Sequence, residues 1–403
     1  MQLEKRRRQK MRETQAGSGA RPRVLVLGHL PPSQGGPATY LSTILNSSLG
    51  DRFDLRPYGI GRPPKPAVHD NFGYSALWNA GVRRAFLAIA VTLRHLFLFP
   101  LELLRFRPAI VHIHTAPYWV YWETAIYLAA CKICHIPCAL QLHYSFELFY
   151  SSCSPVLQRL VLWVLRLTTV FVVICKKDQQ FLEEIGASWI TTIYLPNCVD
   201  VQGLRRSSAQ TLQARTHRED LEVLFMGGSD TKRKGLPELL KAIPAIVQRF
   251  PGVRFRLVAV PPDLVESVLP SEHLDRCVIE GWAADREKAE RLERAGLFVL
   301  PTHGEGMPIA ILEAMASGLP IVATDVAGIP DMVRHEQEGL LIPPGDVPAL
   351  VAAITRLLGC PDLRLAMGHR GAKRVDEEYD LPRGVENWDR LYRSLLETSS
   401  FAQ

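Results

Sequence analysis

Several features that would assign a chain of 403 residues to a particular class of protein are missing from this sequence. Its most apolar segment, 85–104, is interrupted by Arg94, His95 and Pro100, and charges in mid-segment argue against a helix that spans a membrane. The basic N-terminal stretch has no apolar core, so we do not expect a signal peptide. No Asp-x-Asp pair stands at the end of a predicted strand. We therefore expect a globular protein, for which 47% hydrophobic and 22% charged residues are typical.

The eight cysteines are scattered along the chain. Cys131, Cys134 and Cys138 lie near His135, which raises the alternative of a zinc site. The first two are predicted inside a helix, Cys138 begins a predicted strand, and no second pair of ligands follows. We therefore expect buried thiols in a reducing cytoplasm and no metal.

The net charge of +6 is concentrated at the N-terminus. Residues 1–23 hold eight Lys or Arg residues and two acidic ones, whereas the remaining 380 residues hold 39 of each sign. Residues 1–21 are predicted to form a disordered basic arm. Such an arm either stays solvated or binds an anionic partner, and we expect an anionic membrane surface and no nucleic acid.

Short β-rich runs alternate with helical stretches in two series, which is the pattern of parallel sheets with helices on both faces. The first series spans 22–200 and the second 221–380, and a polar linker without apolar periodicity is predicted at 201–220. Residues 381–403 are predicted to contain a closing helix. The predicted strands are 23–27, 109–114, 139–143, 170–174 and 192–195, then 221–226, 255–260, 278–281, 297–300, 320–323 and 340–342.

Two segments of the first series are strongly apolar yet carry basic residues. Segment 85–104, with arginines at both flanks, predicts an amphipathic helix with basic edges. Its apolar face either lies on a membrane surface or packs against the sheet. Segment 156–173 is similar, a helix containing Arg159 and Arg166 followed by a strand.

The second series contains two carboxylates eight positions apart, Glu305 and Glu313. Glu305 follows a strand and a tight turn, and Glu313 lies inside a helix predicted over 308–317. The start of this helix, at Met307, Pro308 and Ile309, is expected to offer free backbone N–H groups, which bind phosphate. An acid does not favourably face a phosphate, so the two carboxylates are expected to face hydroxyl groups. A nucleotide-sugar has this layout: ribose hydroxyls, a diphosphate, then sugar hydroxyls.

The run from His303 to Thr324 resembles the E-x7-E signature of retaining GT-B glycosyltransferases, the glycogen-synthase-like group called glycosyltransferase family 4. The pattern continues through 325–333 and 338–345. The resemblance implies an α/β fold with two Rossmann-like, doubly wound parallel-sheet domains facing a cleft. It also implies that Glu313 holds ribose hydroxyls and that Glu305 contacts the donor sugar or stabilises its developing positive charge.

Two glycine-containing loops extend the resemblance. Gly35 and Gly36 match the donor loop of the family, and their missing Cβ atoms let the backbone approach a ligand. The second loop carries Lys232, Arg233 and Lys234. Lys234 matches the family's lysine, and it and Arg233 would neutralise the departing diphosphate.

The sequence departs from the family pattern at two places. Gly228 or Ser229 stands where an arginine is usual, so either Arg233 or Lys232 substitutes for it or the grip on the diphosphate is weaker. Cys198 replaces the glycine of the turn at 196–200, which is predicted to mark the hinge, and its backbone must avoid or tolerate a positive φ.

Three histidines follow or end strands of the first series. The resemblance places His143 beside the donor sugar as a catalytic residue, and a purely structural role is the alternative. His112 and His114 are predicted to line the acceptor side.

Taken with the resemblance, the sequence predicts a metal-independent, hexosyltransferase-like enzyme without a cofactor. It would transfer sugar from a nucleotide-sugar donor to a saccharide or lipid-linked acceptor in polysaccharide or cell-envelope glycan synthesis. We expect it in the cytoplasm, peripheral on the inner membrane. A sugar-nucleotide 2-epimerase on the same fold and a degenerate, non-catalytic binder are the alternatives.

Overall fold

The computed structural model describes residues 21–30, 35–60, 82–205, 221–228, 230–282 and 285–401. Almost all of the predicted basic arm, residues 206–220 of the predicted linker, and Ser229 lie outside the described residues. The first residues of the predicted linker form the short helix α10 (Val201–Arg205).

The first half of the chain is built on a parallel sheet of six strands in the order β2-β1-β3-β4-β5-β6. Its strands are β1 (Arg23–Gly28), β2 (Asp54–Gly59), β3 (Ile110–Thr115), β4 (Cys138–Leu142), β5 (Val170–Val173) and β6 (Thr192–Tyr194). Its helices are α2 (Gly36–Leu45), α3 (Leu49–Arg52), α5 (Val82–Phe106), α6 (Trp119–Ile133), α7 (Phe146–Ser151), α8 (Pro155–Leu165) and α9 (Lys176–Glu184).

The second half repeats this plan with the order β12-β11-β10-β7-β8-β9, again all parallel. Its strands are β7 (Glu222–Met226), β8 (Arg254–Val258), β9 (Cys277–Glu280), β10 (Leu297–Leu300), β11 (Ile321–Thr324) and β12 (Gly339–Ile342). Its helices are α12 (Leu236–Arg249), α13 (Pro262–Val268), η1 (Ser271–Arg276), α14 (Asp285–Arg294), α15 (Ile309–Ala316), α16 (Ile329–Met332), α17 (Val347–Gly359), α18 (Pro361–Glu378) and α19 (Leu381–Phe401). The prediction of two Rossmann-like α/β sheets is confirmed.

Residues on both faces of the strands inside the two sheets are largely buried, as expected when helices cover a parallel sheet on both sides. On β1, Val24 and Val26 enter one apolar core, whereas Leu25 and Leu27 enter the other. Strand β2 was not predicted; it lies at the sheet edge, is largely exposed and contains Pro57. An edge strand needs neither a continuous apolar run nor every backbone N–H, so it carries a weak signal.

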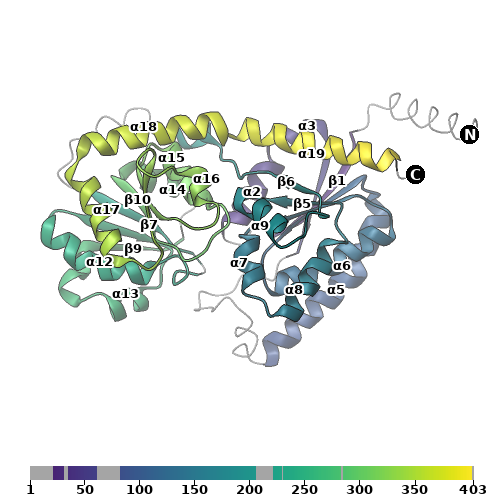
Figure 1. The fold of residues 1–403 in the computed structure, drawn as a ribbon, viewed down its shortest axis with the longest axis horizontal. Helices are drawn as coiled ribbons and strands as arrows, with labels where there is room; N and C mark the ends of the chain where they lie inside the picture. The colour runs from purple at the N-terminus through teal and green to yellow at the C-terminus, as the bar shows by residue number, and fades with distance from the viewer. Residues whose placement is uncertain are drawn as a thin grey trace, which may run out of the picture.

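The C-terminal helices join the two halves. Figure 1 shows α18 along the second half and α19, in yellow, along the first. Trp388 of α19 is buried, and its Nε1 donates a hydrogen bond to the Tyr40 hydroxyl of α2 at 3.0 Å. The end of the chain therefore completes the core of the first half.

The turn at 196–200 lies against the junction between α18 and α19. The Val199 amide donates to Tyr379 O and the Leu381 amide donates to Val199 O, both at 2.9 Å. Cys198 is not among the described residues with positive φ, so its backbone avoids the strain that was anticipated. A Cβ at Gly384 would lie only 2.2 Å from the Cys198 Sγ. The glycine on α19 thus makes room for the cysteine.

Among the described residues, no helix has both the length and the apolar character needed to cross a lipid bilayer.

Candidate functional site

The loop that carries Glu305 presses against the first half of the chain. It runs from the end of β10 to the start of α15, and two of its glycines allow close contact. A Cβ at Gly304 would lie 2.6 Å from the Tyr144 hydroxyl, and one at Gly306 would lie 2.5 Å from Ile174 Cδ1. The Ser145 amide also donates to Glu305 O at 3.3 Å. Glu305 therefore stands where the two halves meet.

Two basic side chains of the second half converge on the Glu305 carboxylate. Arg233 Nη1 lies 3.2 Å and Lys234 Nζ 4.0 Å from its Oε1. This buried oxygen accepts no hydrogen bond within the described residues despite the ionic contacts, so it retains hydrogen-bonding capacity for a ligand. The structure thus brings together Glu305, Arg233 and Lys234, three of the predicted site residues.

This environment shifts the pKa values of the two cations in opposite directions. Burial lowers the pKa of Lys234, although Glu305 opposes the shift. Burial also lowers the pKa of Arg233, but the carboxylates of Glu305 and Asp230 outweigh it and raise the pKa. Asp230 holds the Arg233 guanidinium at 3.1 Å. Lys232, the third cation of the loop, is exposed.

Gly235 explains how Lys234 reaches this position. Its φ of 81° is left-handed, and a Cβ there would lie 1.9 Å from Pro301 O. Only glycine meets both conditions without strain. The turn therefore packs the start of α12 against the end of β10, which sets Lys234 beside the Glu305 loop.

Glu313 lies on α15, the helix that follows the Glu305 loop. Its side chain on α15 is 9% exposed and pairs with Lys288 Nζ of α14 at 2.5 Å. Lys288 was not predicted as a site residue, because nothing in the highly charged α14 distinguishes it from its neighbours.

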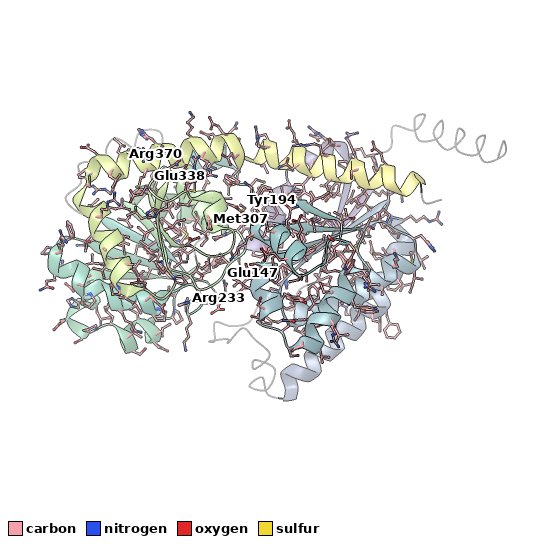
Figure 2. All side chains as sticks on the ribbon, viewed as in Figure 1. Glu147, Tyr194, Arg233, Met307, Glu338 and Arg370 are labelled. Atoms are coloured by element: carbon pink, nitrogen blue, oxygen red, sulfur yellow. The ribbon has the colours of Figure 1, made fainter. Side chains whose placement is uncertain are left out.

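The N-terminus of α15 has no side-chain cap. Its N-cap residue, Pro308, has no N–H, so the expected donors reduce to the amides of Met307 and Ile309 on either side of it. The Met307 carbonyl accepts a hydrogen bond from Asn197 Nδ2 at 2.8 Å. Asn197 was not predicted in this role. Figure 2 shows Met307 and Arg233 at the middle of the molecule, near Glu147 and Tyr194 of the first half, with Glu338 and Arg370 further away.

The predicted glycine loop lies beside the same helix end. A Cβ on Gly36 would lie 3.8 Å from Ile309 Cδ1, and Gly35 has a φ of 134°. Residues 31–34 of this loop are outside the described residues.

His143 belongs to a column of three stacked histidines that leads towards α19. Its Nε2 lies 2.8 Å from His114 Nδ1, and the ring of His114 stacks on that of His112 at 4.3 Å. His112 Nδ1 in turn lies 3.0 Å from the Tyr392 hydroxyl. Burial lowers the pKa of all three, that of His143 to about 3. The three rings are therefore neutral at pH 7. His112 is fully buried instead of lining an acceptor site.

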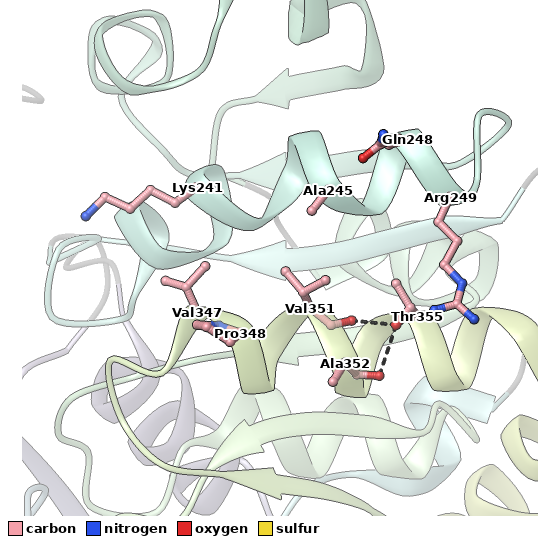
Figure 3. Close-up of a pocket in the computed structure, with 9 residues that line it drawn as sticks. All are labelled: Lys241, Ala245, Gln248, Arg249, Val347, Pro348, Val351, Ala352 and Thr355. Carbon is pink, nitrogen blue, oxygen red and sulfur yellow. Dashed lines mark hydrogen bonds between the residues drawn. The ribbon is translucent and has the colours of Figure 1, made fainter.

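Two further features lie apart from these residues. Figure 3 shows a groove between α12 and α17, lined by residues such as Lys241, Val351 and Thr355, which contains none of the predicted site residues. In the part of the chain that the structure describes, no three His, Cys, Asp or Glu side chains gather as a metal site requires. Cys131 and Cys138 are buried, whereas Cys134 is exposed.

Two doubly wound parallel sheets define the GT-B class of protein. Here Glu305 and Arg233 of the second half lie at its contact with the first half. Residues 61–202 match the family described as "Glycosyltransferase Family 4", and residues 220–360 match "Glycosyl transferases group 1". The chain therefore belongs to the glycosyltransferase family 4 group, as the E-x7-E resemblance predicted.

Curated relatives match parts of this chain. The chain is 30% identical over 223 residues to the phosphatidyl-myo-inositol mannosyltransferase of Mycobacterium leprae (strain TN), covering 55% of this chain and 58% of that protein. It is also 30% identical over 246 residues to the exopolysaccharide phosphotransferase SCO2592 of Streptomyces coelicolor, covering 56% of this chain and 23% of that protein. The chain thus spans between about a quarter and three fifths of these relatives.

The similar solved structures establish the fold. The sucrose-phosphate synthase of Thermosynechococcus elongatus superposes with a TM-score of 0.74 at 18% identity, covering 94% of this chain and all of that one. Anabaena Alr3699/HepE in complex with UDP and glucose gives 0.66 at 15% identity, covering 93% and 100%.

Proposed function

We propose that this protein is a retaining glycosyltransferase. It takes a nucleotide-sugar as donor and a saccharide or lipid-linked compound as acceptor, in polysaccharide or cell-envelope glycan synthesis. The observation that carries the proposal is the convergence of Arg233 and Lys234 on Glu305, within 4.0 Å, next to a helix N-terminus without a side-chain cap. The names of the curated relatives, a mannosyltransferase among them, support the reaction class.

In the proposed reaction, the bond between the sugar C1 and the diphosphate oxygen breaks and a bond from the acceptor oxygen to C1 forms on the same face. The acceptor proton passes to the departing phosphate oxygen. Negative charge grows on the diphosphate as it leaves. Lys234 and Arg233 stabilise that charge, helped by the α15 amides.

The other residues hold the donor in place. Glu313 accepts hydrogen bonds from the ribose hydroxyls, oriented by Lys288 at 2.5 Å. Glu305 faces the donor sugar with the oxygen that retains hydrogen-bonding capacity. Gly35 and Gly36 let the first half close over the donor, and neutral His143 hydrogen-bonds the sugar. Because fixed cations meet the diphosphate, we propose that transfer needs neither divalent metal nor cofactor. The protein would act in the cytoplasm, at the inner membrane.

The test measures the binding and slow hydrolysis of UDP-, GDP- and ADP-sugars by the protein, with and without EDTA. One donor should bind, hydrolyse equally well in EDTA and release a sugar whose first-formed anomer, observed by NMR, matches the donor. Solved relatives that contain UDP make UDP-sugars the first choice. A donor converted to its epimer would identify an isomerase. No binding to any donor would identify a non-catalytic protein.

A further inference from the structure

Two helices of the first half expose rows of large apolar side chains. On α5 the row runs along Phe97, Leu101 and Leu104, and Phe97 is 71% exposed. Spacings of four and three residues place such a row along one side of a helix. Nine of the eleven large apolar side chains exposed in the described residues lie on α5, α6 and α8: Leu96, Phe97, Leu98, Leu101, Leu104, Ile133, Val156, Leu160 and Trp163.

The row on α8 has the same spacing. It consists of Val156, Leu160 and Trp163, of which Trp163 is 55% exposed. A tryptophan with an apolar body and one polar N–H is a side chain that suits an apolar–aqueous boundary.

Both rows belong to one layer of helices. The ring of Phe99 on α5 packs against that of Tyr127 on α6 at 5.0 Å, and the Tyr121 hydroxyl of α6 donates to Val161 O of α8 at 2.9 Å. The inner sides of the three helices share one apolar core with the sheet. Figure 1 shows the three helices together at the lower edge of the first half. We call the outer surface formed by the two apolar rows the docking face.

The docking face is basic at its edges. Arg94 and Arg105 of α5, and Arg159 and Arg166 beside the α8 row, are exposed. Helix α8 contains no acidic residue, and the acidic residue of α5, Glu102, pairs with Arg56 at 2.8 Å. Apolar side chains bordered by exposed arginines thus distinguish this surface.

We propose that the docking face binds the surface of a lipid bilayer with anionic headgroups. The apolar rows would enter the boundary between headgroups and acyl chains, while the arginines extend to the headgroup phosphates. A second copy of this chain fits less well, because two basic faces would be brought together and would repel. Docking does not depend on sugar transfer, so the two proposals fail separately.

The experiment is cosedimentation of the full chain with phosphatidylcholine vesicles, with and without phosphatidylglycerol. We expect binding only when phosphatidylglycerol is present. Phe97→Ser combined with Trp163→Ser should weaken that binding about tenfold or more, because both side chains leave the apolar boundary. Trp282→Ser, which removes an exposed tryptophan of the second half, is the matched control and should bind as the wild type does.

Charge is tested separately from apolar burial. Arg159→Glu should weaken binding to phosphatidylglycerol vesicles, whereas Lys373→Glu on α18, also exposed, should leave it unchanged. Since the basic N-terminal residues are retained in every variant, vesicle binding by the double variant equal to that of the wild type would overturn the proposal. So would a concentration-dependent dimer, observed by sedimentation equilibrium, that the double variant abolishes.

Discussion

The two halves of the molecule share one plan, six parallel strands with helices on both faces, but they differ in the chemistry of their side chains. The second half places charged groups at the candidate site: Arg233, Lys234, Lys288, Glu305 and Glu313. The first half contributes glycines, aromatic rings and neutral histidines.

The outer helices differ as well. In the second half, α14 is almost entirely polar, with the sequence DREKAERLER. In the first half, α5 and α8 expose apolar rows. The same arrangement of strands and helices therefore carries a cluster of charged side chains in one half and an exposed apolar surface in the other. A fold constrains where side chains stand but not what they are.

The largest effect is expected from removing a single cation of the second half. Lys234→Ala should lower kcat/KM for the donor by about 10²–10³-fold, since a fixed charge at the leaving group is lost. Lys232→Ala removes the exposed cation two positions earlier and serves as the control, with little expected change. Equal losses in the two variants would show that the loop acts only by its net charge.

The packing of α19 against the turn at 196–200 can also be broken. Gly384→Ala should lower the free energy of unfolding by about 1–3 kcal/mol, because the new Cβ would meet Cys198 at 2.2 Å. Adding Cys198→Gly should restore most of the loss. Urea unfolding of the two single variants and the double variant measures the coupling, and simple additivity would contradict this account.

A smaller effect is expected at Lys288, the partner of the residue proposed to bind the ribose. Lys288→Ala should weaken nucleotide binding about tenfold, because Glu313 loses its charged partner. Titration calorimetry with UDP, GDP and ADP measures the change. Lys241→Ala, an exposed lysine on α12, is the control. Unchanged affinity in Lys288→Ala would remove Lys288 from the proposed donor site.

The smallest effect concerns the neutral histidines of the first half. The pKa of His143 is lowered to about 3 by burial, so between roughly pH 6.5 and 3 the unfolded chain binds a proton that the folded chain does not. The free energy of unfolding is therefore not reduced by this proton above pH 6.5, and it falls as the pH is lowered towards 3.

His143→Gln should therefore flatten the dependence of unfolding free energy on pH by no more than about 1.4 kcal/mol per pH unit in that range. Urea unfolding at a series of pH values measures it. His335→Gln, at an exposed histidine of the second half, is the control. An unaltered slope in His143→Gln would mean that His143 titrates normally in the folded protein.

The fold was predictable because parallel strands buried on both faces leave continuous apolar runs between helical segments. The edge strand β2 lacks such a run and was missed. The Glu305 motif was predictable because its parts lie close together in the chain. Lys288 and Asn197 were not, because their partners lie 25 and 110 residues away. Asn197 lies within the turn at 196–200, whose predicted role was only that of a hinge.

Periodicity and short spacing in the sequence were enough to predict all described strands but β2, the order of the two halves, and the acidic, basic and glycine residues of the motif loops. Three features follow from the tertiary structure alone: which cations face Glu305, the burial of His112, and the exposure of the apolar rows of α5 and α8. Each of these outcomes depends on packing between distant segments, as with Trp388 and Tyr40, which are 348 residues apart. Local patterns do not specify such contacts, because they form only when the helices and sheets assemble.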